Sequence, residues 1–422
     1  MVSLAEKELA RTLSVDLKHA LVWVARALDY VGVDDIHHNH RVAYIAYECS
    51  KVLGWDAKKS EFCFMAGLIH DCGVSETAEH QHLTSELLPP SVEKHCVQGY
   101  HALQNCKLLS QFSNIILHHH TLWRELECVP LTPYEKDVAA LIFLADRVDI
   151  MRVSAIQGQH EDLVTLYADE ITDKLIANRG SVFRPDLVDA MLKLVSKDGF
   201  WFSMEPEHIE RIPQSFTHLD WLMDGLSLDS ILQLGTFIAG IVDAKSPFTY
   251  QHSIKVAELA EYVGEKLGLP KPELSMLYVA GLVHDIGKLR TPDHILHKEG
   301  KLTPEEYTRI KRHTIDTSIA LQMVFPHSQI GLWASNHHER LNGKGYPFNK
   351  KAGELDMPSR ILAVVDVFQA LSQDRPYRGR LDADQIHEIM VEMVNEGQLD
   401  PLVYDCLHSH MQECYQLSTD IH

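Results

Sequence analysis

Apolar residues recur at helical spacing along much of the chain. Between residues 254 and 267 five of them share one face of a helix with a period of 3.6 residues. They are Val256, Leu259, Ala260, Val263 and Leu267. Gly268 and Pro270 follow, and both residues are typical of a helix end. Alternation of apolar and polar residues is scarce, so the pattern predicts an all-α protein in which any sheet is minor.

Two predicted helices begin with the same capping motif, one in each half of the chain. In the second half Thr303 precedes Pro304, and Glu306 follows three positions after the threonine. The threonine can cap the helix, the proline fits its first position, and the glutamate can reach back to the cap. Thr132-Pro133-Tyr134-Glu135 repeats this motif in the first half.

The two halves also share an ordered set of histidines and aspartates. In the second half the set consists of His252, His284, Asp285, His313, His337, His338 and Asp366. In the first half it consists of His38, His70, Asp71, His95, His119, His120 and Asp146. The step from the first histidine to the His-Asp pair is 32 residues in both halves, and the step from the single histidine to the His-His pair is 24. Potential ligands that recur in order at matching steps indicate two metal-binding helical domains in tandem.

The repeat extends beyond the potential ligands and sets the expected domain bounds. GLIHDCG at 67–73 matches GLVHDIG at 281–287, and LIFLADRVDI at 141–150 resembles ILAVVDVFQA at 361–370. We predict a first domain at 1–200, a connector at 201–225 and a second domain at 226–422. The apolar segment 226–242 can pack the two domains together or form a homodimer, and the sequence leaves both open.

The chemistry of the set favours a dinuclear metal site in each domain. A His-Asp pair in an apolar helix offers two donors, and its carboxylate can bridge two metals inside a helical bundle. One metal is assigned to His252, His284, Asp285 and Asp366, and the other to His313, His337 and His338, with Asp285 bridging. Nitrogen and oxygen donors without thiolate favour Fe, Mn, Ni or Zn.

The competing interpretation is that these histidines are core residues bonded to backbone carbonyls, which holds more easily for one histidine than for an ordered set that occurs twice. Other histidines of the first half are expected to be surface or core residues: His37, His40, His80, His82, His101 and His118. A shift of register would exchange His118 for His120 as a ligand.

Composition and net charge limit the kinds of molecule that the protein is expected to bind. The formal net charge of −20 argues against binding a nucleic acid polymer, which needs a basic face. A small anionic substrate remains possible, because a local metal and lysine site can override the global field. The chain has no apolar run of about 18 residues, which predicts no membrane span. Its first residues lack an apolar signal core, and its eight cysteines form no Cys-x-x-Cys pair, so a cytoplasmic protein with reduced thiols is expected.

The second half carries further motifs that resemble a known family. They are Asp243 to Thr249 leading to His252, His284-Asp285-Ile286-Gly287-Lys288, His337-His338-Glu339-Arg340, Gly345-Tyr346-Pro347 and Arg375-Pro376-Tyr377-Arg378. This set, across nearly all of 230–410, resembles the bacterial HD-GYP phosphodiesterases, a branch of the HD superfamily of metal-dependent phosphohydrolases. The resemblance implies an all-helical enzyme that cleaves a cyclic dinucleotide such as cyclic di-GMP. The tandem layout also resembles the Vibrio-type phosphodiesterases that hydrolyse 3′,3′-cyclic GMP-AMP, so the expected substrate is cyclic di-GMP, 3′,3′-cyclic GMP-AMP or both.

Three positions depart from the family pattern. Phe248 stands where some members carry a glutamate that supports a third metal, so a dinuclear site is expected. Asn342 and Gln369 stand where an aspartate is common. Neither residue is among the expected ligands, so these two changes are predicted to tune the site without abolishing it.

The implied mechanism is hydrolysis of a phosphodiester by a hydroxide that two metals activate. Asp285 and Lys288 are the expected catalytic residues, because Lys288 lies four positions after His284 and can meet a phosphate as a point charge. Arg375 and Arg378 are expected to clamp the second phosphate. Gly345, Tyr346 and Pro347 are expected to wall the substrate pocket. Tyr346 can stack on a base, contact a partner or simply pack as an aromatic residue.

The first half keeps the potential ligands and loses the phosphate-binding residues. Val74 stands in place of Lys288, Thr121 stands in place of Glu339, and no Gly-Tyr-Pro follows His120. The favoured interpretation is a metal-loaded regulatory domain; the alternative is a second hydrolase acting on a nucleotide monophosphate or a linear dinucleotide. For the whole chain the alternatives to a phosphodiesterase are a non-catalytic cyclic dinucleotide sensor and another nucleotide phosphohydrolase of the HD superfamily.

Overall fold

A computed structural model describes residues 15–30, 37–223, 226–245, 251–326, 328–374 and 379–420. Within these ranges the regular structure is helical, and the only bridges are two isolated ones, Arg179 to Phe183 and Asn342 to Lys351. The predicted all-α class is therefore confirmed. Among the described helices, none combines the length and the apolar character that crossing a bilayer requires.

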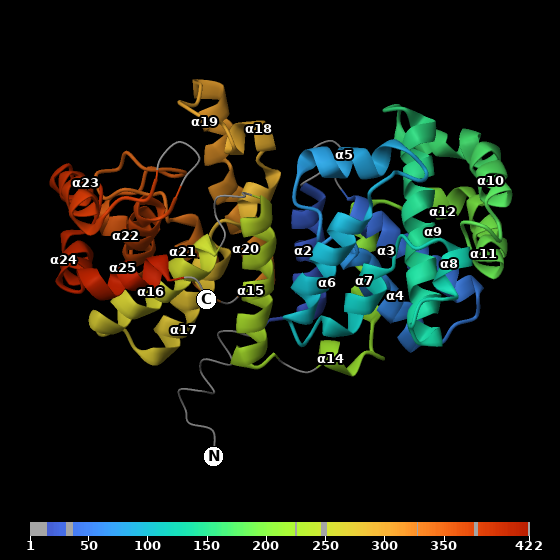
Figure 1. The fold of residues 1–422 in the computed structure, drawn as a ribbon, viewed down its shortest axis with the longest axis horizontal. Helices are drawn as coiled ribbons and strands as arrows, with labels where there is room; N and C mark the ends of the chain where they lie inside the picture. The colour runs from blue at the N-terminus through green and yellow to red at the C-terminus, as the bar shows by residue number, and fades with distance from the viewer. Residues whose placement is uncertain are drawn as a thin grey trace, which may run out of the picture. The chain divides into compact units, whose positions relative to one another are not determined.

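The chain divides into two compact units, Asp16–Gly225 and Leu226–His422. Figure 1 shows the helices of both units. Those of the first unit are α2 (Leu17–Asp29), α3 (His38–Val52), α4 (Ala57–Ile69), α5 (Thr77–Ser85), α6 (Glu93–Gln104), α7 (Ser113–Leu117), α8 (Trp123–Leu126), α9 (Pro133–Ile156), α10 (Ala168–Ala177), α11 (Pro185–Val195), α12 (Asp198–Phe202), α13 (Pro206–Ile209) and α14 (Asp220–Met223).

The second unit repeats the order of the first. Its helices are α15 (Leu228–Lys245), α16 (His252–Lys266), α17 (Lys271–Val283), α18 (Asp293–Leu296), α19 (Pro304–Lys311), α20 (His313–Val324), α21 (Ile330–Ser335), α22 (Met357–Ser372), α23 (Ala383–Asn395), α24 (Pro401–Ser409) and α25 (Met411–Thr419). A 3₁₀ turn, η5 (Ile286–Arg290), follows α17.

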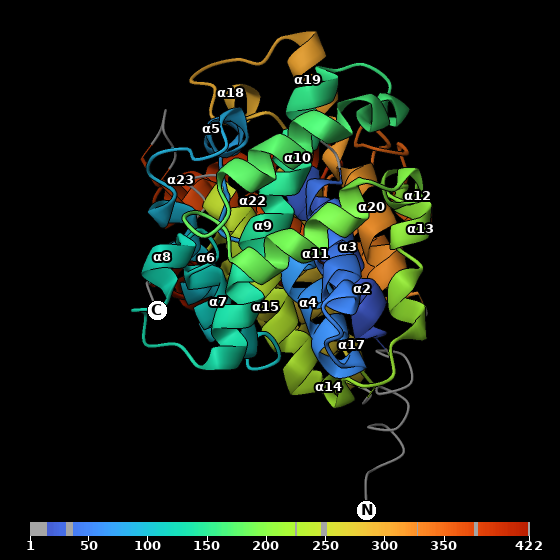
Figure 2. The same cartoon turned by 90° about the vertical axis from the view of Figure 1, so that its right-hand side faces the viewer.

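Each unit is built around the helix that carries the first histidine of its set. In the first unit α3 packs against α4 and α9, as Figure 2 shows, and in the second α16 packs against α17 and α22. A glycine allows the first of these contacts in both units. A Cβ on Gly67 would lie 2.5 Å from the Cα of Ala43, and one on Gly281 would lie 2.6 Å from that of Ala257. The repeated Gly-Leu-x-His-Asp segment therefore places its His-Asp pair against the neighbouring helix.

The helix starts and ends agree with the local sequence signals. The capping boxes predicted at Thr132 and Thr303 are both present, with Glu135 and Glu306 reaching back. The helix predicted from residue 254 begins two residues earlier, at His252, and ends at Lys266 before Gly268. The left-handed conformation of Gly268, with φ of +82°, explains why the chain turns there.

The stretch 201–223, for which the sequence predicts a connector, is folded as part of the first unit. Trp201 and Phe216 are buried, and the Trp201 Nε1–H donates to the carbonyl of Val195 at 2.9 Å. The Phe216 ring lies 5.3 Å from that of Phe64 on α4. Aromatic residues spread through a polar segment therefore attach it to the core, because burying each ring removes a large apolar area from water.

Candidate metal centres

Five segments of the second unit bring its seven potential ligands together. His252 begins α16, His313 begins α20, the pair His337-His338 follows α21, and Asp366 lies inside α22. The sequence analysis places the His-Asp pair inside an apolar helix, whereas α17 ends at Val283 and the pair follows it. His284 and Asp285 both face the centre of the bundle, where His284 Nε2 lies 3.3 Å from Oδ2 of Asp285.

The carboxylate of Asp285 lies between two pairs of imidazoles. Its Oδ2 is 3.8 Å from His252 Nε2 and 3.3 Å from His284 Nε2. Its Oδ1 is 3.5 Å from His313 Nε2 and 3.6 Å from His337 Nε2. Each oxygen therefore faces its own imidazole pair, which is the arrangement of a carboxylate that can bridge two cations.

Asp366 completes the cluster from the other side. Its Oδ1 lies 3.3 Å from His252 Nε2 and 3.8 Å from His284 Nε2. Its Oδ2 lies 3.9 Å from Nδ1 of His338, so this histidine presents its other ring nitrogen to the cluster. Geometry thus separates His252, His284 and Asp366 from His313, His337 and His338, and each group offers ligand atoms within 4.8 Å of one another.

Hydrogen bonds on the outer side of the rings orient them. The Nδ1 atoms of His284, His313 and His337 lie 2.7, 2.5 and 2.5 Å from the carbonyl oxygens of Gly281, Ile310 and Ala334. Each carbonyl is three residues before its histidine. A proton on Nδ1 that is donated to a carbonyl leaves the lone pair of Nε2 facing the cluster. Bonding to backbone carbonyls, the competing interpretation of these histidines, is therefore compatible with ligation.

Burial and mutual charge shift the pKa values in this centre strongly. Burial alone would raise the pKa of Asp285, but His284 and Lys288 outweigh it and hold that pKa well below its usual value. Burial lowers the pKa of His313 to about 4 and that of His337 to about 3. For His284 the burial effect is overcome by the Asp285 carboxylate, which raises the pKa to about 9. At neutral pH the centre therefore offers a charged carboxylate and neutral imidazoles at most positions.

The residues present fit a pair of divalent cations. The buried atoms His284 Nε2 and Asp285 Oδ1 have no hydrogen-bond partner among the described residues. Buried polar atoms without partners are costly, and here they all point at one centre. Two ligands held at about 2.1 Å by one ion lie roughly 3.0 to 3.4 Å apart, so the separations of 3.3 to 3.9 Å between ligand atoms need only a small contraction.

Metal binding is expected to release a proton from this centre near neutral pH. His284 must lose its proton to coordinate, and its pKa of about 9 means that the metal-free chain holds that proton at pH 7. Affinity should therefore rise with pH and level off above about pH 9. Calorimetric titration with Mn²⁺ in buffers of different ionisation enthalpy measures the released proton. A heat independent of the buffer at pH 7 would contradict the prediction.

Lys288 lies over the same centre. It is part of η5, and its Nζ forms a close ion pair with Oδ2 of Asp285. The ammonium group is partly exposed, so it borders both the carboxylate and solvent. In the first unit Val74 occupies this position and is buried. Lys288 therefore adds a positive charge at the mouth of the second centre that the first centre lacks.

The Gly-Tyr-Pro loop is tied to the same histidine pair. The backbone N–H of Tyr346 donates to the carbonyl of His338 at 3.1 Å, and the two rings lie 4.8 Å apart. A Cβ on Gly345 would lie 2.3 Å from the backbone nitrogen of Arg340, so no other residue fits there. The buried carboxylate of Glu339 accepts from the N–H of Phe348 at 2.7 Å and closes the loop.

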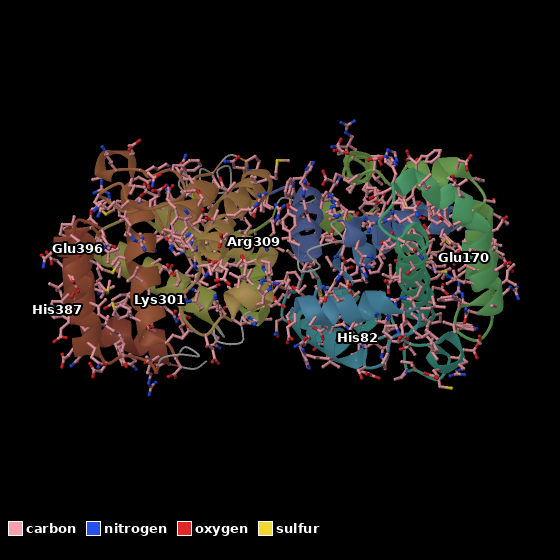
Figure 3. All side chains as sticks on the ribbon, turned by 90° about the horizontal axis from the view of Figure 1, so that it is seen from above. His82, Glu170, Lys301, Arg309, His387 and Glu396 are labelled. Carbon is pink, nitrogen blue, oxygen red and sulfur yellow. The ribbon has the colours of Figure 1, made fainter. Side chains whose placement is uncertain are left out.

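A cavity lies beside the residues that lead into this loop, but Gly345, Tyr346 and Pro347, the residues expected to wall the substrate pocket, are not among those that line it. The cavity has a volume of about 480 Å³ and is lined by Arg340, Asn342, Lys344, Glu396 and Gln398. Figure 3 labels Glu396, which follows the end of α23. The remaining expected positions, Phe248, Arg375 and Arg378, lie outside the described residues.

The first unit repeats the geometry of the carboxylate between imidazoles. Oδ2 of Asp71 is 3.9 Å from His38 Nε2 and 3.6 Å from His70 Nε2, and Oδ1 is 3.7 Å from His95 Nε2 and 3.8 Å from His119 Nε2. Three of these residues carry buried atoms without partners among the described residues: His70, Asp71 and His119. The predicted first-domain ligands are therefore brought together in the same arrangement as those of the second domain, at slightly longer separations.

The geometry places His120, rather than His118, at the first centre. Nδ1 of His120 lies 3.8 Å from Oδ2 of Asp146, and His120 belongs to the cluster with Asp71. His118 instead contacts the hydroxyl of Thr121 at 3.4 Å. Both line a cavity of about 340 Å³ beside the centre. Among the other histidines, His82 on α5 is exposed (Figure 3).

Several residues around the first centre were not foreseen from the sequence. Arg147 donates to Oδ2 of Asp146 at 2.6 Å and so neutralises a potential ligand. The carboxylate of Asp149 receives His38 Nδ1 at 2.8 Å, whereas in the second unit the amide oxygen of Gln369 takes this role beside His252. The repeat aligns Asp149 with Gln369, so a comparison of the two copies could have found this difference.

Gly287 is expected to be indispensable for the second centre. A Cβ there would lie 2.0 Å from the carbonyl oxygen of His313 and 2.8 Å from the backbone nitrogen of Thr317, and backbone atoms cannot move aside as the end of a flexible side chain can. Gly287→Ala should lower the free energy of unfolding by about 1 to 3 kcal/mol or more. The matched control is Gly240→Ala, because Gly240 in α15 has open space and alanine favours a helix by up to about 1 kcal/mol. Urea denaturation of both variants tests this, and equal midpoints would contradict it.

Comparison with known proteins agrees with this tandem arrangement. HD-domain family models match residues 35–151 and 237–403. The 3′3′-cGAMP-specific phosphodiesterase 1 of Vibrio cholerae is 44% identical over 405 residues, which cover 96% of this chain and 94% of that protein. A cyclic di-GMP phosphodiesterase of Pseudomonas aeruginosa is 34% identical over 193 residues, 44% of this chain and 45% of that protein.

A solved structure shows the same fold. The crystal structure of a cyclic GMP-AMP specific phosphodiesterase of V. cholerae aligns with a TM-score of 0.63 at 21% identity, covering 94% of this chain and 98% of that one. Two HD domains in one chain, together with a relative that is matched along nearly its whole length, establish the relationship. The chain belongs to the HD-GYP family of the HD superfamily, as a member that carries two HD domains in tandem.

Proposed function

We propose that the second domain hydrolyses a cyclic dinucleotide, 3′,3′-cyclic GMP-AMP or cyclic di-GMP, to the linear dinucleotide and so terminates a second-messenger signal. The observation that carries the proposal is the carboxylate of Asp285, whose two oxygens face separate imidazole pairs while Lys288 lies beside it. The substrate class is supported by the relatives in V. cholerae and P. aeruginosa, which are named for cleaving these two messengers.

The donor set assigns the residues that would hold two metals. One ion would be held by His252, His284 and Asp366 and the other by His313, His337 and His338, with Asp285 shared between them. These are nitrogen and oxygen donors, which suit Fe, Mn, Ni or Zn. When bound, two such cations supply a water of lowered pKa and neutralise charge on the phosphoryl oxygens.

Residues of the chain itself position the substrate. Lys288 Nζ can turn from Asp285 to a non-bridging phosphoryl oxygen once the carboxylate has other partners, and it acts there as a fixed positive charge. The Tyr346 ring lies 4.8 Å from that of His338, tilted by 39°, and can offer a flat apolar surface to a base or ribose. Arg375 and Arg378, from the family motif, are proposed to hold the second phosphate.

For the first domain we propose a metal-binding, regulatory role without turnover of the cyclic dinucleotide. It keeps the carboxylate between imidazoles and has Val74 in place of the lysine. Its Asp146 is already paired with Arg147, which weakens that carboxylate as a ligand. Arg147 is buried and already paired with Asp146, and Val74 stands where Lys288 would offer a charge, so a cation bound there would not by itself position a phosphate well.

Product chromatography tests the proposed activity. The purified chain, loaded separately with Mn²⁺ and Fe²⁺, is incubated with cyclic di-GMP and with cyclic GMP-AMP. The control is the double variant His284→Ala/Asp285→Ala. Linear dinucleotide from the wild type and none from the control is the expected result, and the relative rates identify the preferred substrate. Binding without product from either substrate, with both metals, would instead support a cyclic dinucleotide sensor.

A further inference from the structure

A second cluster of histidine and carboxylate groups lies in the first domain, outside the HD centre. Asp29 ends α2, and His37 and His40 lie at the start of α3. These three residues each offer a ligand atom within 4.8 Å of the others. Oε1 of Glu210, which follows α13, lies 3.9 Å from His40 Nε2. From composition alone His37 and His40 are expected to be surface or core residues, yet the structure places them together with two carboxylates.

Buried polar atoms without partners gather at this cluster as they do at the HD centres. His37 Nδ1, Asn39 Oδ1 and His40 Nε2 are all buried, and none has a hydrogen-bond partner among the described residues. His40 is completely inaccessible to solvent. The rings of His37 and His40 lie 5.5 Å apart at 82°. Two buried imidazole nitrogens without partners among the described residues therefore lie close together beside a carboxylate.

The internal repeat shows that the fold does not require these imidazoles. Asp29 accepts from the backbone N–H of Asn39 at 2.7 Å and caps α3. In the second domain Asp243 accepts from the N–H of Ser253 at 3.2 Å and caps α16 in the same way. The repeat aligns Gln251 and Ile254 with His37 and His40. Gln251 adopts the same left-handed conformation as His37, so the helix start forms without either imidazole.

We propose that the imidazoles of His37 and His40 form a third metal site in the first domain, suited to Zn²⁺, with the carboxylate of Glu210 beside His40 Nε2. The carboxylate of Asp29 receives His40 Nδ1 at 2.9 Å, which directs Nε2 toward Glu210. A carboxylate behind a histidine is the usual arrangement that orients a zinc ligand. Two imidazoles and a carboxylate are a common zinc donor set that leaves a fourth position for water.

The charges of the cluster favour a cation over an anion. Asp29 and Glu210 bring two carboxylates, and Arg26 brings one guanidinium, which pairs with Glu210 at 3.4 Å. Glu210 is partly exposed and provides a route from solvent. An ion at this site would tie Asp29 to the first turn of α3, next to His38 of the HD centre.

Metal content of the full chain tests the site independently of the proposed enzymatic activity. The chain is stripped with a chelator, equilibrated with Zn²⁺ and assayed by atomic emission. The variant His37→Gln/His40→Ile carries the residues of the second domain and should bind one zinc per chain fewer than the wild type. His160→Gln, an exposed histidine of the same domain, should bind as much as the wild type.

Two further variants separate this site from its neighbour. In a His70→Ala/Asp71→Ala background, His37→Gln/His40→Ile should still remove one zinc, because the two sites are distinct. If the double variant misfolds by circular dichroism, Glu210→Gln replaces it and should weaken one zinc equivalent at least about tenfold. Unchanged zinc content or affinity in the folded variants would overturn the proposal and leave His40 as a histidine that bridges Asp29 and Glu210.

Discussion

Replacing Asp285 with alanine is expected to lower turnover of the cyclic dinucleotide by at least about 1000-fold. Asp285 lies within 3.3 to 3.8 Å of four imidazoles and supplies the only carboxylate between the two imidazole pairs among the described residues. Without it neither candidate metal position keeps a full set of ligands. The imidazoles themselves should remain in place, because backbone carbonyls hold three of them from behind.

The repeat provides a matched control for this variant. Asp71 occupies the equivalent place in the first domain, with the same surroundings of four imidazoles. Asp71→Ala should lower the metal content of the chain and leave turnover within about threefold of the wild type. Product chromatography and atomic emission on both variants decide the matter. Equal losses of turnover would show that the chemistry does not belong to the second domain alone, and Asp285→Asn tests the role if the alanine variant is unstable.

Much of the arrangement of the second centre could be predicted because the spacing of the repeat reflects the path of the chain. Histidines at the starts and ends of helices, such as His252 and His313, must converge when those helices form one bundle. The spacing does not predict which groups form hydrogen bonds with the outer nitrogen of each imidazole ring. The carbonyls that orient His284 and His337 depend on where α17 and α21 end, and the apolar pattern predicts the His-Asp pair inside a helix that in the structure ends before it.

Contacts between residues far apart in sequence account for most of the remainder. Arg147 reaches Asp146 because it is anchored on the carbonyl of Leu83, 64 residues away, and no local pattern encodes that contact. The stretch 201–223 was expected to be a connector because its polar residues and prolines dominate its composition. Two of its aromatic residues, Trp201 and Phe216, are buried in the core of the first unit, so the stretch is part of that unit.

One difference between the two centres that bears directly on a phosphate is Lys288, where the first domain has Val74. Lys288→Val should therefore give the second centre the character of the first, with turnover lowered by about 100- to 1000-fold. The loss should be mainly in kcat, because the ammonium group acts on charge that develops at the phosphoryl oxygens. In the metal-free chain this group is paired with Asp285, so its removal frees the carboxylate and should leave metal content unchanged or higher.

Turnover should fall in Lys288→Val while metal content stays the same or rises, and this difference separates the two possible roles of Lys288. A variant that loses turnover while keeping its metals shows that the charge acts on the substrate. Lys288→Arg keeps the charge and should recover part of kcat, limited by the different shape of the guanidinium group. If Lys288→Val loses metals in proportion to turnover, the lysine serves only to hold Asp285 in place, and the positive charge at the mouth of the centre has no part in hydrolysis. Because Val74 already shows that an HD domain folds around an apolar residue at this position, loss of the fold is not the expected cause of a low rate.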